Sequence, residues 1–174
     1  MEFDSIFVPY LHVVKFNGVN AFNKIIEDWN DAKYLFEYFK KREQDLKYYG
    51  VSVSDAIKIT RDEINKFRNK LNQILNSSKP NLDQLFSNLD NQEYRIDVEL
   101  SQKKAKPNPK YWLRIYAIKI ESNIYLIVGG ALKLKQFMDD DDATKNELIK
   151  LNQVRDFLRE EGVTDYDGFY ELII

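Results

Sequence analysis

The sequence contains no cysteine and a single histidine, His12, and both absences restrict its chemistry. Without cysteine, the chain can form neither a disulfide nor a metal site with thiolate ligands, and this composition fits a reducing cytosol. One histidine excludes a zinc site built from several histidines and a pair of histidines that act as acid and base. We interpret His12 as an ordinary surface or core residue rather than as a group that titrates near neutral pH.

An excess of positive charge and a long apolar run are also missing. The chain has 26 basic and 28 acidic residues, so no global field attracts nucleic acid, and such binding would need a local basic patch. The longest apolar run, Ile124 to Leu132, is too short to span a bilayer. The first residues, MEFDSIF, lack the features of a signal peptide. We therefore expect a soluble, cytoplasmic protein that does not contact a membrane.

The chain has 174 residues, of which 44% are hydrophobic, and we expect one domain, 1–174, with a hydrophobic core. A β-branched segment, Leu11 to Phe16, predicts a strand that ends at a turn. Asn20 and Asp31 are predicted to cap two consecutive amphipathic helices, and Gly50 to follow them.

Two capping boxes predict further helix starts. Ser54 is expected to open a short helical turn, and Thr60 with Glu63 to start a helix that ends near residue 76. Thr144 with Glu147 predicts the start of the last long helix, with Gly162 just after its end, and residues 166–174 are apolar enough to dock. The acidic run 139–142 is interpreted as a solvated linker; a carboxylate metal site, and with it a metal-dependent enzyme, is the alternative.

A three-strand meander is predicted for the central part of the chain. Residues 94–100 alternate between apolar and polar, whereas residues 101–110 hold four lysines and two prolines and predict an exposed basic loop. Two strands follow, joined by a turn at residues 121–123. The favoured register pairs Leu100 with Tyr111, which places Ile96 opposite Ile115 and Asp97 opposite Arg114.

These elements predict an α+β fold: a small, mainly antiparallel sheet made of an N-terminal strand and the meander, with helices packed on one face and a C-terminal helix. This order of elements, together with basic residues on and after the meander strands, resembles the RelE-like toxin superfamily. The basic residues are Arg95, Arg114, Lys133 and Lys135. The likeness covers about 11–158 and leaves 159–174 as a C-terminal extension.

The resemblance implies a toxin of a toxin–antitoxin or mobile-element system that cleaves mRNA without a metal or other cofactor. It also implies an antitoxin and mRNA or a ribosome as partners, and no direct contact with DNA. In such a site Arg95 and Arg114 would hold the scissile phosphate, Lys133 or Lys135 would add positive charge, and Tyr116 would transfer a proton. Flanking RNA would be held by phosphate contacts and base stacking, from Lys103, Lys104, Lys106 and Trp112.

Three features depart from the family pattern. Asp97 and Glu99 share a face with the two arginines, and the acidic run 139–142 repels RNA. Lys133 has the parity of the apolar face, unless the Gly129-Gly130 pair forms a bulge that redirects it. The alternative is a non-catalytic protein-interaction or regulatory module with the same fold, in which these charges form a solvated ladder.

Overall fold

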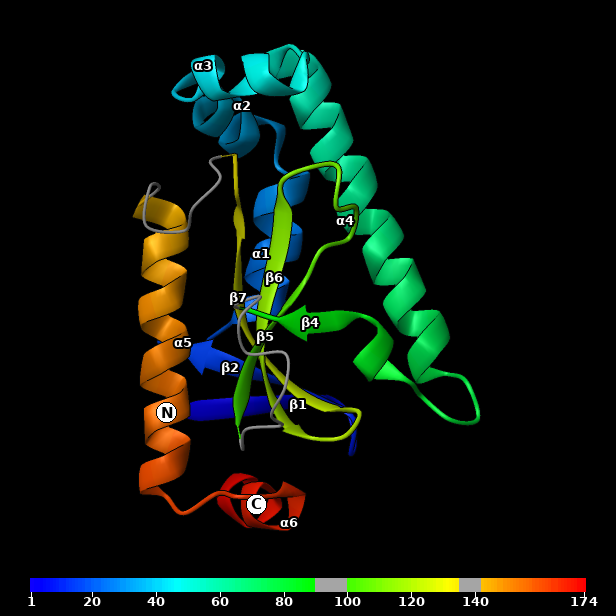
Figure 1. The fold of residues 1–174 in the computed structure, drawn as a ribbon, viewed down its shortest axis with the longest axis vertical. Coiled ribbons are helices and arrows are strands. Elements are labelled where there is room, and N and C mark those ends of the chain that lie inside the picture. The colour runs from blue at the N-terminus through cyan, green and yellow to red at the C-terminus, as the bar shows by residue number, and fades with distance from the viewer. Residues whose placement is uncertain (90–99, 135–141) are drawn as a thin grey trace.

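The computed structural model describes residues 1–89, 100–134 and 142–174, which form an α+β fold with one mixed, mostly antiparallel sheet (Figure 1). The sheet has seven strands in the order β1-β2-β7-β6-β5-β4, and β3 pairs with β2. Only β2 and β7 run parallel among these pairs. The strands are β1 (Glu2–Phe7), β2 (Leu11–Phe16), β3 (Val19–Asn20), β4 (Phe86–Asn88), β5 (Ser101–Ala105), β6 (Leu113–Glu121) and β7 (Ile124–Leu132).

Helices cover both faces of this sheet. The helices are α1 (Ala21–Asn30), α2 (Ala32–Lys40), α3 (Glu43–Leu46), α4 (Val53–Leu75), α5 (Asp142–Glu160) and α6 (Tyr166–Ile173), with two 3₁₀ turns, η1 (Lys47–Tyr49) and η2 (Leu82–Gln84). Helices α1, α2 and α4 enclose one apolar core, and α5 and α6 enclose a second core on the opposite face. The expected α+β class is confirmed. The expected arrangement had helices on one face of the sheet, whereas α5 and α6 also cover the other face.

The central hairpin explains why two cores form. Along β6, Ile115 and Ala117 pack into the core of α1, α2 and α4, while Tyr116 and Ile118 pack into the core of α5 and α6. Side chains of a strand alternate between its two faces, so a strand that is apolar at nearly every position is buried on both sides. Trp112, which directly precedes β6, packs into the first core.

The predicted N-terminal helices are confirmed with their caps. The Asn20 side chain accepts hydrogen bonds from the amides of Phe22 and Asn23, and Asp31 caps α2 in the same way. Gly50 follows η1 with a φ of 66°, a left-handed conformation that glycine adopts at low cost. The predicted strand at residues 11–16 is β2, and β1 was not predicted.

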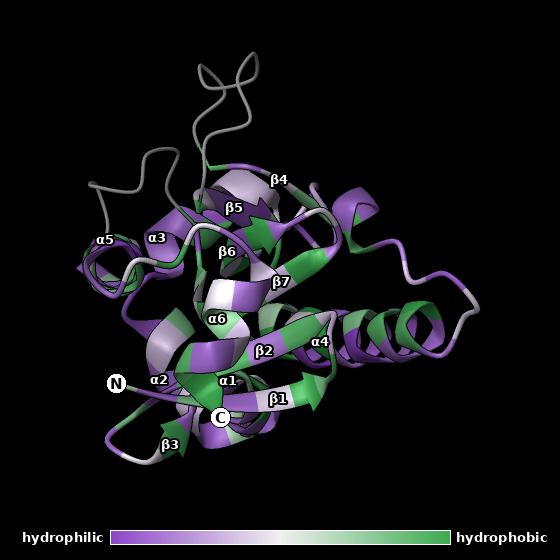
Figure 2. Cartoon of the chain, turned by 90° about the horizontal axis from the view of Figure 1, so that it is seen from below, coloured by the Kyte–Doolittle hydropathy of each residue, from purple (hydrophilic) through white to green (hydrophobic). Residues whose placement is uncertain are grey.

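The capping box at Thr60 is wrong as a helix start. Ser52 caps α4, which is continuous from Val53 to Leu75 and carries hydrophobic and hydrophilic residues on different sides (Figure 2). Thr60 is buried inside this helix, where its hydroxyl donates to the carbonyl of Ala56 and accepts from the indole Nε1 of Trp112. The predicted end of the helix near residue 76 is confirmed.

The predicted basic loop begins with a strand. Residues Ser101–Ala105 form β5, which pairs with β6 so that Ala105 lies opposite Ile115. The favoured register, in which Ile96 meets Ile115, is therefore wrong. Most of the predicted strand at residues 94–100 lies outside the described residues.

The C-terminal helices correct one prediction and confirm two. Helix α5 is already formed at Asp142, so Thr144 is a buried residue of its first turns and not a cap. Gly162 ends α5 with a φ of 76°, as expected, and the tail docks as α6 through the buried ring of Phe169. Residues 139–141 of the acidic run lie outside the described residues. None of the described helices has the length and hydropathy needed to cross a membrane.

Candidate functional site

A β-bulge in the central hairpin redirects the residues at the open end of β7. Tyr116 pairs with Gly129 and Ala117 with Ile127, so Val128 has no partner in β6. Because of this extra residue, Ala131 belongs to the core of α5 and Leu132 to the opposite core. Lys133 follows with the parity of Ala131, on the face that also carries Arg114. The bulge considered from the sequence was placed at the Gly129-Gly130 pair, whereas the extra residue is Val128 and both glycines pair with β6. The shift takes Lys133 off the apolar face of α1, α2 and α4.

Arg114 lies beside this open end, on the face of β6 toward α5. Its side chain is largely buried, and Nη1 donates to the carbonyls of Tyr111 at 2.9 Å and Leu113 at 2.7 Å. Burial lowers the pKa of Arg114, although an arginine keeps its charge in such a site. Within the described residues no carboxylate forms an ion pair with Arg114. In the described part of the chain, its hydrogen bonds go to backbone carbonyls.

Two tyrosines lie within electrostatic range of Arg114. Tyr116 is only 1% exposed, so substrate does not reach its ring without a rearrangement. Tyr49, at the end of η1, is half-buried, and its hydroxyl lies 3.5 Å and 3.4 Å from the carbonyl oxygens of Lys133 and Leu134. Burial raises the pKa of Tyr49, and the charge of Arg114 acts in the opposite direction. Tyr49 is thus the more accessible phenol of this cluster.

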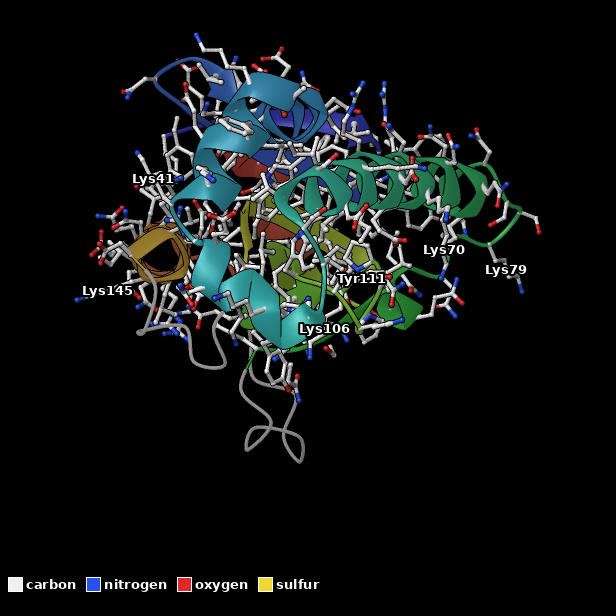
Figure 3. The ribbon with its side chains drawn as sticks, turned by 90° about the horizontal axis from the view of Figure 1, so that it is seen from above. Lys41, Lys70, Lys79, Lys106, Tyr111 and Lys145 are labelled. Carbon is white, nitrogen blue, oxygen red and sulfur yellow. The ribbon has the colours of Figure 1, made fainter. Side chains whose placement is uncertain are left out.

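Lys106 adds a second positive charge to the same region. Partial burial and then the charge of Arg114 lower the pKa of Lys106. Lys106 also lines a groove of about 190 Å³ together with Lys66 and Lys70 of α4. Figure 3 looks down on this end of the molecule, with Lys106 and Tyr111 labelled close together and Lys70 farther along α4. Glu63 also lines the groove and lies 3.9 Å from the ammonium group of Lys66, so the net positive charge comes chiefly from Lys70 and Lys106, and this charge attracts anions.

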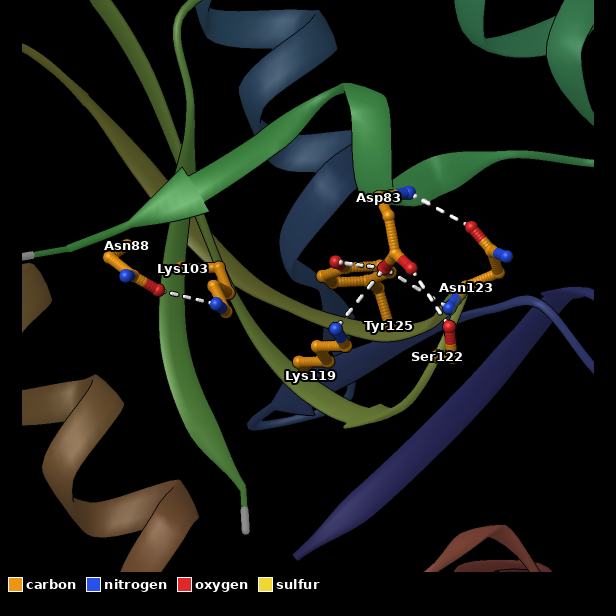
Figure 4. Close-up of polar contacts among 7 residues, drawn as sticks. All are labelled: Asp83, Asn88, Lys103, Lys119, Ser122, Asn123 and Tyr125. Carbon is orange, nitrogen blue, oxygen red and sulfur yellow. Dashed lines mark hydrogen bonds and ion pairs between the residues drawn. The ribbon is translucent and has the colours of Figure 1, made fainter. Parts of the chain in front are cut away.

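The other RNA-binding residues predicted from the sequence have structural contacts. The ammonium groups of Lys103 and Lys104 donate to the Asn88 side chain and to the carbonyl of Leu89, which ties β5 to the end of β4 (Figure 4). Trp112 is fully buried, and its Nε1 donates to Thr60 at 2.9 Å. Its indole therefore offers no face on which a base could stack.

The structure brings together only part of the predicted phosphate site. Arg114, Tyr116 and Lys133 lie at the same end of the β6–β7 ladder. Arg95 and Lys135 lie outside the described residues, as do Asp97 and Glu99, so their predicted roles stay predictions. No group of three or more potential metal ligands occurs in the described ranges.

Sequence reasoning missed Tyr49, Lys66 and Lys70 as members of this site. Tyr49 is more than sixty positions from Arg114 in the chain, and nothing local indicates that η1 reaches the end of β7. Lys66 and Lys70 are spaced four apart on α4, a spacing that places them on one side of a helix. That signal was available, but it does not reveal which strand the helix covers.

Comparisons with known proteins do not extend this description. No family model, curated protein or solved structure matches the chain.

Proposed function

We propose that this chain is a RelE-like protein that binds an RNA strand at the open end of the β6–β7 hairpin, with Arg114 as the phosphate ligand. The observation that carries the proposal is the guanidinium of Arg114, which donates to the carbonyls of Tyr111 and Leu113 and has no carboxylate partner in the described residues. Lys106 lies within electrostatic range of it. Guanidinium and ammonium groups in such a position attract phosphate oxygens. The groove that Lys106 shares with Lys70 continues the positive surface, and Lys70 would hold the next phosphate.

The same residues support an endoribonuclease that uses the 2′-hydroxyl of the RNA as its nucleophile. Lys106 would act as a base in its neutral form, which a lowered pKa makes more populated, and would accept the proton of the 2′-hydroxyl. The 2′-oxygen would then form a bond to phosphorus as the bond to the 5′-oxygen breaks, giving a 2′,3′-cyclic phosphate. Tyr49, whose pKa is raised, would donate the proton that the departing 5′-oxygen requires. Arg114 would neutralise the charge that develops on the phosphate.

RNA binding is tested by fluorescence anisotropy with a short fluorescein-labelled single-stranded RNA. Arg114→Met removes the guanidinium and keeps much of the apolar stem, and we expect the Kd to rise about tenfold or more, since a charge-assisted hydrogen bond contributes about 1.5–3 kcal/mol. Arg155→Met is the matched control, because Arg155 lies in α5 and pairs with its neighbour Asp156. Equal effects of the two substitutions would exclude Arg114 as the specific phosphate ligand.

Cleavage is tested by incubating the protein with mRNA, alone and with ribosomes, and by induced expression in a bacterium. The toxin proposal expects growth arrest that Arg114→Met relieves and Arg155→Met does not. It also expects that an antitoxin encoded beside the gene would restore growth. Binding without cleavage would support the proposed RNA interface and contradict the proposed nuclease activity.

The second candidate is a non-catalytic interaction or regulatory module with this fold. The observation that favours it is the burial of Tyr116 and Trp112, two residues expected to contact RNA. This candidate expects no growth arrest from the wild-type protein, and stable capture of a protein partner by a surface other than the Arg114 cluster.

A further inference from the structure

The second half of β7 has an open edge inside the sheet. Strand β2 pairs with β7 only as far as Ile127, and then runs on to pair with β3. In the described residues no strand pairs with Val128–Leu132 on the side away from β6. The carbonyl of Leu132 lies on that side, since it accepts a hydrogen bond of 2.6 Å from the hydroxyl of Tyr38. Backbone groups two residues apart point to the same edge, so those of Gly130 lie there too.

A cavity of about 620 Å³ occupies the notch beside this edge. Its floor is the open half of β7, and its walls come from β2 and β3, from α1 and α2, and from the start of α5. The cavity therefore extends to both faces of the sheet. An added strand would occupy this position and would direct alternate side chains to the two faces.

The two walls differ in chemistry. On the face of α1 and α2, the wall holds the apolar and aromatic side chains of Ile25, Trp29 and Tyr34, together with the charged pair of Lys24 and Asp28. On the face of α5, Glu147 lies against Gly129. Its Oε1 accepts from Lys150 at 2.8 Å, while its buried Oε2 has no hydrogen-bond partner. A buried carboxylate oxygen without a donor is costly, and a ligand that brings a donor relieves this cost.

We propose that the open half of β7 is a strand-addition site for an extended segment of a partner protein, in which apolar side chains alternate with a basic one. The apolar side chains would pack against Trp29 and Tyr34, and the basic side chain would approach Glu147. The main chain of the segment would pair with Gly130. This inference does not depend on RNA binding, because it concerns a different edge of β7 and a different set of residues.

The charges of the cavity favour a basic rather than an acidic side chain. Both lysines in its wall already have a carboxylate: Lys24 lies 3.1 Å from Asp28, and Lys150 lies 2.8 Å from Glu147. An incoming acid would have to break one of these ion pairs, whereas an incoming base finds Glu147 with an oxygen that lacks a donor. Burial raises the pKa of Glu147 and Lys150 opposes the shift, so acidification should weaken the binding of a basic segment.

The test uses an acetylated and amidated peptide of about six residues, the usual length of a strand, in which leucine and arginine alternate. The peptide is titrated into the isotope-labelled full chain and followed by NMR. Strand addition expects slower hydrogen exchange at the amides of Gly130 and Leu132, together with a shift of the Trp29 indole signal. A peptide with glutamate in place of arginine should bind at least about tenfold more weakly.

Two substitutions make the test specific. Glu147→Gln should weaken binding of the arginine peptide about tenfold, while Glu160→Gln, at an exposed position of the same helix, should leave it unchanged. Asn146→Trp places a large ring at the exposed rim of the cavity and should abolish binding without disturbing the core. Equal binding of the two peptides, or no protection of Gly130 and Leu132 at saturating peptide, would overturn the proposal.

Discussion

Gly129 lies directly under the carboxylate of Glu147: a β-carbon at position 129 would overlap with Oε2. Gly129 is buried in β7, and Glu147 reaches it from α5 across the face of the sheet. The φ of Gly129 is not in the left-handed region, so the constraint at this position comes from packing: an added side chain has to displace the carboxylate of Glu147. The contact connects the bulge of the central hairpin with the helix that covers it.

Gly129→Ala should destabilise the fold by about 1–3 kcal/mol, because the added methyl group overpacks a buried contact. The measurement is urea unfolding, with the free energy of unfolding compared between the variant and the wild type. Gly168→Ala is the control: the nearest atom to a β-carbon there is at 3.5 Å, and the residue lies in α6. Alanine in that helix should be neutral or stabilising by up to about 1 kcal/mol.

A second substitution tests whether the loss of stability in Gly129→Ala comes from the contact with Glu147 or from a general loss of packing. Glu147→Ala removes the carboxylate that the new methyl group would meet. The double variant should then lose less stability than the sum of the two single variants, as expected for residues in direct contact. Additive losses would show that Gly129 is required for a reason other than Glu147.

Thr60→Val should lower the free energy of unfolding by about 1–3 kcal/mol. The substitution keeps the shape of the side chain but removes the acceptor of the buried indole N–H of Trp112, which then has no partner. Thr164→Val is the control, because Thr164 is exposed and should change stability by no more than about 0.5 kcal/mol. Unfolding followed by tryptophan fluorescence measures both, and equal small losses would contradict the structural role of this hydrogen bond.

Local sequence signals predicted the N-terminal half of the fold well where only one local structure was compatible with them. Asn20 and Asp31 each precede an apolar pattern of helical period, and both cap a helix. At Thr60 the same kind of motif was compatible with two local structures. Its hydroxyl can cap a helix from outside or donate to the carbonyl four residues earlier inside one, and it does the latter. Only the strand that brings Trp112 to this hydroxyl decides between them.

The predictions failed where strand pairing, or a helix that covers one face of the sheet, decides the local structure. Residues 101–105 show no apolar alternation, yet they form β5 because their backbone fills the space between β4 and β6. Arg114 was expected to be exposed, since it alternates with Leu113 and Ile115. It is largely buried because a second layer, α5, covers that face of the sheet. Nothing in the pattern of β6 indicates a second layer.

Asp83→Asn should destabilise the fold at neutral pH by about 1–2 kcal/mol, a figure reduced because the carboxylate is partly exposed. Asp83 accepts hydrogen bonds from the hydroxyls of Tyr125 at 2.6 Å and Ser122 at 2.9 Å and from the amide of Asn123, and lies 3.5 Å from the ammonium group of Lys119 (Figure 4). Burial acts to raise the pKa of Asp83, but these hydrogen bonds and the charge of Lys119 outweigh it and hold the pKa below 3.8.

The pH dependence of this effect has a definite sign. A carboxylate with a lowered pKa stabilises the folded state above its unfolded pKa, and this contribution is lost as the pH falls through the folded pKa. The difference between wild type and Asp83→Asn should therefore be constant near neutral pH and shrink below about pH 4. Asp62→Asn, at an exposed position of α4, should show no such trend in urea unfolding. A difference that grows on acidification would contradict the assignment.

His12 should make the fold less stable as the pH falls below neutrality. It is fully buried between β1 and α6, where Nδ1 lies 2.9 Å from the hydroxyl of Ser5 and Nε2 lies 2.9 Å from the carbonyl of Pro9, while the ring packs edge-on against Phe169. Burial lowers the pKa of His12 from 6.5, and the hydrogen bond to Pro9 only partly offsets this. Stability from a neutral histidine is complete above the unfolded pKa and is lost as the pH falls toward the folded pKa.

This loss can be assigned because the chain has no other histidine. Glu147, with a raised pKa, acts with the opposite sign: its contribution is present at low pH and is lost as the pH rises. The comparison with His12→Gln removes the Glu147 effect, which both proteins share. Unfolding free energies measured from about pH 7.5 down to about pH 5 should fall more steeply for wild type than for His12→Gln. Parallel slopes would mean that His12 keeps an unperturbed pKa and that its burial under α6 does not hold in solution.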